Sequence, residues 1–476
     1  MGEEILQDKC GFCVGHSLHD VYSMSETLQH RGRGFAGIAA MNDKSIDVIK
    51  WMGPVNSFDI ADMHKIFPGK NHYHLFMAHV RYPTKGRKDS IMDAHPHVIG
   101  GEIHERHGHI LITNCNMALV HNGQVDEKYF KEIDRKNFKT PCDSEALLHY
   151  YEKFGEVELM KKIPGSYSMA IADRRKREVI VMRDRTGIKP GAIGLKDGKH
   201  QAASEDRALI HNGGKLIKEM NPGSIYYFNI DGECPRTDII SPKQRICFFE
   251  FNYLLHHEST LRGISVNSIR DSLGERLGLE FRESFPNEKI DFVSYLPRCP
   301  EPAANGFSRA TGIPFEEIFY KIRAERSFQG PNKEERTNSI KLNLNLTPNA
   351  TKELPGKTPV IIDDSIVRGT NIKQARELLY EKGKVKKAFF LSYTPPIGII
   401  GEDGEPRGCY YGVDIPNDDN FIARDGLRNK SIEEISKEVN MPVFYISKQG
   451  MESVFNKYGI SLDQLCTYCI GGERPF

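Results

Sequence analysis

The stretch VIIDDSIVRGT, residues 360–370, places two adjacent acids between an apolar run and a loop of small and polar residues. Its β-branched start, residues 360–362, follows a turn segment that contains proline and glycine, and it predicts a short buried strand. Asp363 and Asp364 then fall at the carboxyl end of the strand, where open α/β sheets bind their ligands. The stretch therefore constrains this part of the chain to an α/β fold with a ligand site at the sheet edge.

The loop after the two acids has the chemistry of a sugar-phosphate site. Its backbone N–H groups, the hydroxyls of Ser365 and Thr370 and the start of the next helix favour a phosphate monoester, and Gly369 lets the backbone approach closely. The carboxylates of Asp363 and Asp364 repel a phosphate but accept hydrogen bonds from vicinal sugar hydroxyls, directly or through Mg²⁺. A ribose 5-phosphate satisfies both groups. On spacing alone, an ordinary helix N-cap beside two acids is the alternative.

Length and charge limit the class of protein. A chain of 476 residues is long enough for two or three domains. Its 65 Lys and Arg against 64 Asp and Glu leave a net charge of +1, which gives no electrostatic reason to expect nucleic acid or an anionic membrane as partner. No apolar stretch approaches the roughly eighteen residues of a membrane span, and the acidic amino terminus lacks a secretory signal. We therefore expect a cytoplasmic protein.

The pattern of predicted elements changes near residue 240. Residues 10–240 alternate short apolar runs with turns, which favours a β-rich α+β domain of packed sheets with helices near 23–32 and 142–155. Residues 245–476 instead alternate helices and strands, and this order predicts a parallel sheet. The expected elements of this half are helices at 265–281 and 371–383 and strands at 290–297 and 386–394.

The stretch at 360–370 resembles the phosphoribosyl-pyrophosphate signature of the type I phosphoribosyltransferases, in the form carried by the amidophosphoribosyltransferases. The resemblance runs from about residue 10 to 469. It implies an N-terminal-nucleophile (Ntn) hydrolase glutaminase of stacked sheets with flanking helices, followed by an α/β phosphoribosyltransferase domain. It also implies a homo-oligomer, either a dimer or a tetramer.

The activity that this resemblance implies is the first committed step of de novo purine synthesis. Phosphoribosyl pyrophosphate, glutamine and water become 5-phosphoribosylamine, glutamate and pyrophosphate. Two alternatives stay open at this point. One is a glutaminase-coupled amidotransferase that acts on a different phosphorylated acceptor, and the other is a non-catalytic sensor of a sugar phosphate or nucleotide.

The resemblance makes Cys10 the glutaminase nucleophile. In this family the cysteine becomes the amino-terminal residue when a short leader is removed, here residues 1–9. A free α-amine, with a pKa of about 7.7 to 8.0, can then serve as base for a thiol whose pKa is near 8.5. Cys13 falls where the family usually has an aromatic residue, and we interpret it as a core thiol.

Four further segments resemble the family's glutamine pocket: LQHRG, HVRYPT, HNG and CDSE. By that match Arg81 pairs with the glutamine α-carboxylate and Asp143 with its α-ammonium, and Arg31 is a third contact. Asn122 and the N–H of Gly123 stabilise the tetrahedral oxyanion.

The second half is expected to bind phosphoribosyl pyrophosphate and Mg²⁺, the metal at Asp363 and Asp364. Basic groups of a closing loop are expected near the pyrophosphate. The expected sugar-phosphate contacts are Asp363, Asp364, Ser365, Arg368, Gly369, Thr370, Arg326 and Lys341.

Three segments depart from the family pattern. The pyrophosphate loop, in which most members carry an acid, reads LPRCP at 296–300, and a second family motif is replaced by LLHHES at 254–259. After HRG, this chain has Arg33-Gly34 where Gln-Glu is usual. The first two changes leave the identity of the acceptor open, and the third predicts a different contact near the glutamine pocket or the domain interface.

Two cysteines near the carboxyl end, Cys466 and Cys469, have the spacing of a zinc half-site or a redox pair, which chance also produces. The iron–sulfur branch of the family supplies two more ligands, which match Cys247 and Cys409. By this resemblance the four thiolates hold a structural [4Fe–4S] cluster, and tetrahedral zinc is the alternative.

Overall fold

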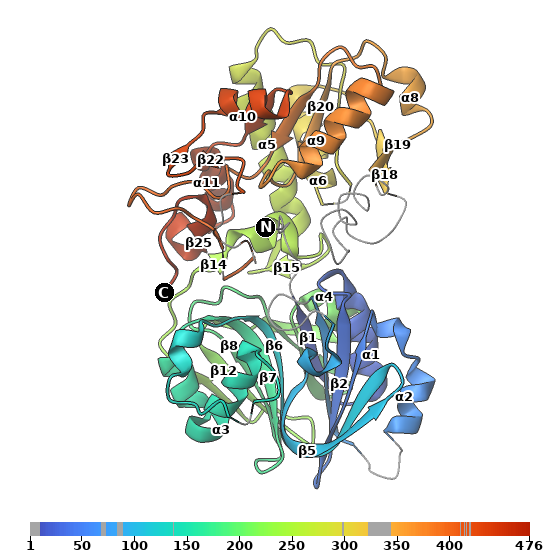
Figure 1. Cartoon of the computed structure of the whole chain (residues 1–476), viewed down its shortest axis with the longest axis vertical. Helices are drawn as coiled ribbons and strands as arrows, with labels where there is room; N and C mark the ends of the chain where they lie inside the picture. The colour runs from blue at the N-terminus through green and yellow to red at the C-terminus, as the bar shows by residue number, and fades with distance from the viewer. Residues whose placement is uncertain are drawn as a thin grey trace.

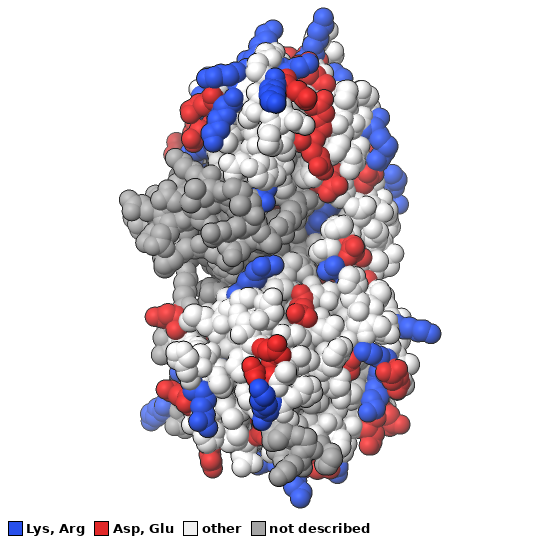
Figure 2. Space-filling view, turned by 90° about the vertical axis from the view of Figure 1, so that its right-hand side faces the viewer, with Lys and Arg blue, Asp and Glu red and all other residues white. Residues whose placement is uncertain are grey.

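A computed structural model describes residues 10–67, 73–82, 89–136, 138–297, 299–321, 344–409, 411–413, 415, 417 and 420–476. Figure 1 shows two bodies, the first from blue to green and the second from green to red, with β14 (Ile246–Cys247) and β15 (Thr260–Leu261) where they meet. On the face in Figure 2, basic and acidic side chains are interspersed and neither sign dominates. Within the described residues, no helix combines the length and the apolar character needed to cross a membrane.

The first body is built on one antiparallel sheet of 13 strands, in the order β11-β9-β10-β1-β4-β2-β3-β6-β7-β8-β12-β13, with β5 also paired to β6. The strands are β1 (Gly11–Gly15), β2 (Phe35–Met41), β3 (Ile46–Met52), β4 (Leu75–Arg81), β5 (His97–Arg106), β6 (His109–Gln124), β7 (Ser166–Asp173), β8 (Glu178–Arg183), β9 (Ala192–Lys196), β10 (Lys199–Ala203), β11 (Lys215–Glu219), β12 (Ser224–Asn229) and β13 (Arg236–Ile239).

This sheet folds back into two layers whose inner faces share a core. Alternation along the strands decides which side chains enter it, because successive residues point to opposite faces. Phe12 of β1 and Val120 of β6 lie in the shared core, whereas Cys13 and Leu119 lie on the outer faces. Helices α1 (Leu18–Thr27), α2 (Ile60–Ile66) and α4 (Asp206–His211) cover one outer face, and α3 (Asp143–Lys162) covers the other. The predicted stacked sheets with flanking helices are confirmed.

Both predicted helices of this body form with shifted bounds. The first begins earlier than expected, because Ser17 caps it by accepting a hydrogen bond from the N–H of Asp20 at 3.1 Å. The second continues past Gly155, which takes a non-helical conformation inside α3 without ending it. A glycine thus marks a kink here, where the sequence pattern predicts a helix end.

The second body contains a four-stranded parallel sheet in the order β17-β20-β21-β24. Its strands are β17 (Phe292–Tyr295), β20 (Pro359–Asp363), β21 (Phe389–Ser392) and β24 (Val443–Tyr445). Val360 and Ile362 face one core and Ile361 faces the other, so both sides of the sheet are buried. The helices that cover the two sides are α5 (Val266–Ser284), α6 (Glu301–Thr311), α9 (Thr370–Glu377), α10 (Ile432–Val439) and α11 (Lys448–Lys457). The predicted parallel sheet is confirmed.

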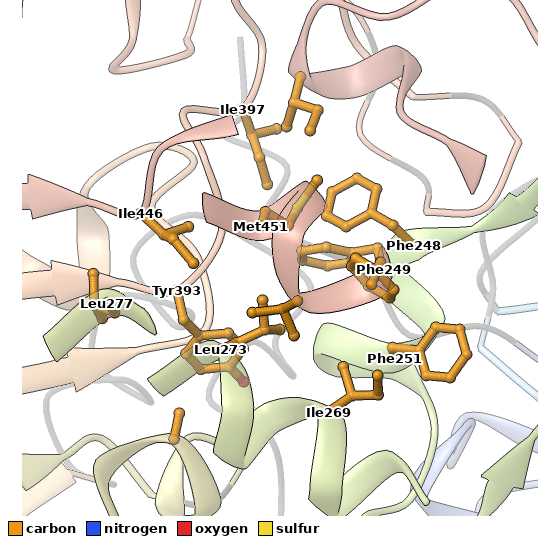
Figure 3. Packing of buried hydrophobic residues seen from close by; sticks show 14 of the residues in the cluster. Phe248, Phe249, Phe251, Ile269, Leu273, Leu277, Tyr393, Ile397, Ile446 and Met451 are labelled. Atoms are coloured by element: carbon orange, nitrogen blue, oxygen red, sulfur yellow. The ribbon is translucent and has the colours of Figure 1, made fainter. Parts of the chain in front are cut away.

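Helix α5 runs through the larger of the two cores that flank the parallel sheet. Figure 3 shows Ile269, Leu273 and Leu277, one turn apart on α5, in the same cluster as Tyr393 and Met451. This spacing places one apolar face of the helix against the sheet.

Helices α5 and α6 cross at glycines. A Cβ added to Gly274 would lie 1.8 Å from the carbonyl oxygen of Ala303, and one added to Gly306 would lie 2.0 Å from that of Asp271. The backbones can approach this closely only because both positions lack a side chain.

Gly274→Ala should therefore force α5 away from α6 and destabilise the protein by roughly 1–3 kcal/mol. The measurement is the midpoint of thermal and urea unfolding. Glu283→Ala, at an exposed position of the same helix, is the control and should stay within about 0.5 kcal/mol of the parent. Equal midpoints for the two variants would contradict the close crossing.

Candidate active sites

The two acids of the second body lie at the edge predicted for them. Strand β20 ends at Asp363, Asp364 follows, and both side chains are buried. Ser365 donates to Asp364 at 2.6 Å and the N–H of Asp364 bonds to Asp363 at 3.0 Å. Burial, reinforced by the charge of Asp364, raises the pKa of Asp363 well above its usual value. Two buried carboxyls in contact favour donors or a cation beside them, which hydroxyls and Mg²⁺ both provide.

The loop beyond the acids is shaped for close backbone approach. Gly369 has a φ of +74° immediately before α9, and a Cβ there would lie 2.6 Å from the Cδ1 of Ile422. The described members of the predicted sugar-phosphate set all line one cavity of about 980 Å³: Asp363, Asp364, Ser365, Arg368, Gly369 and Thr370. Arg326 and Lys341 lie outside the described residues.

Both bodies line this cavity. The first body contributes His30 and Arg33, and the second contributes His256 and His257 of the LLHHES segment and Cys299 of the LPRCP loop. Three segments that depart from the family pattern therefore meet at one site. Arg298 lies outside the described residues. Because Arg33 adds a guanidinium from the first body, the cavity is suited to an anionic ligand that touches both domains.

Cys10 lies directly before β1, on the opposite side of the interface. Ser204 links β1, two residues after Cys10, to the predicted oxyanion group: the Ser204 Oγ accepts from the N–H of Phe12 at 3.0 Å and lies 3.5 Å from the Nδ2 of Asn122. The Asn122 side chain is fully buried, and its Oδ1 has no hydrogen-bond partner among the described residues. A Cβ on Gly123 would lie 1.9 Å from the carbonyl oxygen of Ser166, so only glycine fits.

The two predicted glutamine contacts both lie next to Cys142. The Nη2 of Arg81, at the end of β4, is 3.9 Å from the Cys142 Sγ, and Asp143 begins α3. Asp143 accepts a hydrogen bond from the N–H of Val125 at 2.8 Å, immediately after β6. A guanidinium and a carboxylate therefore lie close together at the carboxyl ends of β4 and β6.

Arg31, which the resemblance predicts as a third glutamine contact, lies between two acids. Its guanidinium bonds to Glu205 at 2.6 Å and to Glu250 at 3.3 Å, and its Nε donates to the Cys10 carbonyl at 3.1 Å. The side chain is almost completely buried. In this conformation its contact with the glutamine site is indirect and runs through the backbone of Cys10.

These charges form a buried network across the interface. Glu205, before α4, also accepts from His30 at 2.8 Å and from the Ser259 hydroxyl at 2.6 Å, whereas Glu250 also pairs with Lys189 at 3.2 Å. Burial opposes ionisation of Glu205, but His30 and Arg31 outweigh it and hold its pKa well below the usual value. Sequence analysis missed Glu205, Glu250 and Lys189, because no local motif relates residues so far apart in the chain.

The four cysteines of the predicted cluster gather at the contact between the chain's tail and the second body. Cys247 of β14 pairs in register with Cys466 of β25 (Leu465–Cys466), and Cys409 and Cys469 lie within electrostatic range of Cys247. All four are buried. In this conformation, the described parts of the chain contain no group of three His, Cys, Asp or Glu spaced to hold a metal ion. The donor set nevertheless suits a thiolate-bound centre in its chemistry, because all four candidate ligands are sulfurs and all are buried.

Comparison with known proteins agrees with both halves. A family model described as a glutamine amidotransferase domain matches residues 106–234. The whole chain is 30% identical to the amidophosphoribosyltransferase of Methanothermobacter thermautotrophicus and covers 96% of it, and it is 29% identical to that of Bacillus subtilis. A solved structure of the B. subtilis glutamine phosphoribosylpyrophosphate amidotransferase, complexed with ADP and GMP, is similar with a TM-score of 0.78 at 26% identity. The match covers 98% of this chain and 97% of that one.

Glu205→Gln keeps the volume of the buried acid but removes the charge that balances His30 and Arg31. We expect the free energy of unfolding to fall by about 3–5 kcal/mol, because removing one charge of a buried ion pair leaves the other charge buried without a partner. Thermal and urea unfolding measure it. Glu473→Gln is the control, since this acid pairs with Arg245 at 3.5 Å with 85% of its side chain exposed, and its loss should be about 0–1 kcal/mol. Parent-like stability of Glu205→Gln would show that the network does not hold the domains.

Proposed function

The chain belongs to the amidophosphoribosyltransferase family, and from this membership we propose how its two sites divide the reaction. The enzyme transfers the amide nitrogen of glutamine to phosphoribosyl pyrophosphate, the first step of purine biosynthesis. The observation that carries the division is the cavity at Asp363 and Asp364, which is lined by both domains. The relatives support this activity over another acceptor or a non-catalytic sensor.

In the glutaminase half, the Cys10 sulfur attacks the amide carbon of glutamine. The thiol proton goes to the α-amine of Cys10, which is free once residues 1–9 are removed. Asn122 and the N–H of Gly123 stabilise the oxyanion as it forms. When the intermediate collapses, the C–N bond breaks, the α-ammonium of Cys10 returns its proton to the leaving nitrogen, and ammonia departs while a thioester remains on Cys10. Water then hydrolyses the thioester to glutamate. Arg81 and Asp143 hold the α-carboxylate and α-ammonium, and their opposite charges next to Cys142 support this orientation.

In the transferase half, ammonia attacks the sugar C1 and pyrophosphate leaves. Asp363 and Asp364 accept hydrogen bonds from the ribose hydroxyls, and the loop from Ser365 to Thr370 holds the 5-phosphate. Mg²⁺ bound near the two acids and the substrate phosphates would offset the charge on the leaving pyrophosphate. We assign the same role to the basic residues Arg326 and Lys341. We propose that ammonia passes to C1 within the protein, and the lining of the acceptor cavity by both domains supports this.

We assign a [4Fe–4S] cluster to Cys247, Cys409, Cys466 and Cys469, with zinc as the alternative. Burial of all four cysteines, which come from three distant segments, and the pairing of Cys247 with Cys466 support a structural centre that ties the tail to the second domain. All ten cysteines lie within the described residues and none forms a disulfide, which suits the reducing cytoplasm, where we propose that the enzyme works as a homodimer or homotetramer.

Cys10→Ser should lower glutamine-dependent synthesis by roughly 1,000-fold or more while leaving synthesis from free ammonia intact, because only the nucleophile is removed. Release of glutamate and of pyrophosphate measures the two halves separately. Cys13→Ser is the matched control. The Cys13 thiol is buried on the outer face of β1, and the hydroxyl of the substituted serine can still donate to the Val21 carbonyl. Full glutamine-dependent activity in a chain that retains Met1 would contradict the proposed base, and glutamate release without pyrophosphate release would contradict the transfer step.

Anaerobically purified protein should contain about four iron and four sulfide per chain if the cluster assignment holds. Cys466→Ser should lose this iron and lower the unfolding midpoint, because the tail then loses its anchor to Cys247. Cys234→Ser, at a half-exposed thiol in the other domain, should retain it. Stoichiometric zinc would favour the alternative, and absence of both metals would exclude either centre.

A further inference from the structure

Four buried imidazoles form a cluster beside the glutamine contacts: His79 on β4, His95 just before β5, His97 at the start of β5, and His121 on β6. The rings of His79 and His95 stack with their centroids 4.0 Å apart, and His97 lies edge-on to His95 at 4.6 Å. His79 and His121 belong to the motifs HVRYPT and HNG, whose assigned roles involve only their neighbours. The mechanism above leaves all four rings without a role.

Hydrogen bonds join three of these rings into a chain. The Nε2 of His95 is 2.9 Å from the Oγ of Ser144, and the Nδ1 of His121 is 3.0 Å from the same oxygen. Burial lowers the pKa of His79 to about 3 and that of His95 well below its usual value, so both rings are neutral. A serine hydroxyl carries one proton, so at least one of the two rings that contact it, His95 and His121, must donate to Ser144.

His79 fixes the backbone at the other end of the chain. Its Nε2 lies 3.0 Å from the carbonyl oxygen of His121, and because a carbonyl only accepts, His79 must be the donor. His79 comes from one layer of the sheet and His121 from the other. The peptide that leads into Asn122 is therefore tied across the sandwich.

The chain ends at the predicted oxyanion groups. His121 immediately precedes Asn122 and Gly123, and a Cβ on Gly123 would lie 2.7 Å from the Nε2 of His121, so the ring packs against that glycine. Ser144 is adjacent to Asp143 at the start of α3, with 3.5 Å between its Oγ and the Asp143 Oδ1. The backbone at His95 is itself held close to β2, because a Cβ on Gly37 would lie 2.2 Å from the His95 carbonyl.

We propose that His95 is a positioning residue for glutamine hydrolysis, which acts through Ser144 on His121 and so aligns the Asn122 and Gly123 donors with the oxyanion. This inference rests on the oxyanion role proposed for Asn122 and Gly123. Strand β6 carries the Asn122 and Gly123 donors. In this arrangement, hydrogen bonds that begin at His95, on a separate segment before β5, support that strand. Loss of that support displaces the donors without removing any group that touches glutamine.

The test compares three single variants of the full-length holoenzyme. His95→Phe keeps a ring against His79 but removes the bond to Ser144, and His95→Gln keeps a polar group near the position of Nε2. His97→Phe is the matched control, since His97 is equally buried and its Nε2 has no partner among the described residues. We expect His95→Phe to lower kcat for glutamine hydrolysis roughly 10- to 100-fold with little change in the KM for glutamine. His95→Gln should recover most of this loss, and His97→Phe should stay near the parent.

A double-mutant cycle adds a readout that packing alone would not change. Ser144→Ala removes one oxygen from the same chain, so its effect should not add to that of His95→Phe. Ammonia-dependent synthesis should be unchanged in both, which shows that the fold is intact. If His95→Phe also loses the ammonia-dependent reaction, its fold is disturbed and the Ser144→Ala variant alone tests the proposal. Parent-like glutaminase activity in Ser144→Ala then overturns it.

Additive losses, or equal kcat in His95→Phe and His97→Phe, would also overturn it. Asn122→Ala separates this inference from the proposed function. Undiminished glutaminase activity in that variant would remove the assigned oxyanion hole itself, whatever the result at His95.

Discussion

The buried ion network between the domains is the interaction on which the arrangement of this enzyme depends. Glu205 and Glu250 lie in different domains, and Arg31 bonds to both. Charges taken out of water are stabilised only when their partners have good geometry, so a shift of either domain would leave a buried charge unpaired. The network therefore favours one relative orientation. Because the acceptor cavity is lined from both sides, the same contacts determine its shape.

The network also reaches the nucleophile. Arg31 donates to the carbonyl of Cys10, and Lys189, which pairs with Glu250, also donates to the carbonyl of Gly412 near the cysteine cluster. The same set of charges thus contacts the backbone at two places: at the start of the glutaminase domain, and near the clustered cysteines of the phosphoribosyltransferase domain. The histidine cluster has a comparable role within the first domain, where uncharged rings tie the two layers of the sheet at the oxyanion strand. In both places, rigid polar contacts act on the backbone next to the reacting groups.

The fold brings the three segments that depart from the family pattern to one site. Arg33, the pair His256-His257 and Cys299 belong to three segments that are far apart in the chain, yet all line the acceptor cavity. Substitutions that look unrelated along the sequence are therefore changes to one surface. Since the relatives support the same reaction, this surface concerns how the acceptor is held between the two domains.

Local patterns in the sequence determined the parallel strand that ends at Asp363, the glycine loop after it and the β-rich first half, because strand alternation, turn residues and helix spacing act over a few neighbouring residues. The motifs also identified Cys10, Asn122 and Asp143 as candidates. Helix ends were less predictable, as Ser17 and Gly155 show, since capping and kinks depend on single contacts. Only the tertiary structure decided that Arg31 spans the domain interface and that His95 bonds to Ser144. Burial brings these partners together from distant segments, and the free energy of pairing charged and polar groups away from water has no signature in the local sequence.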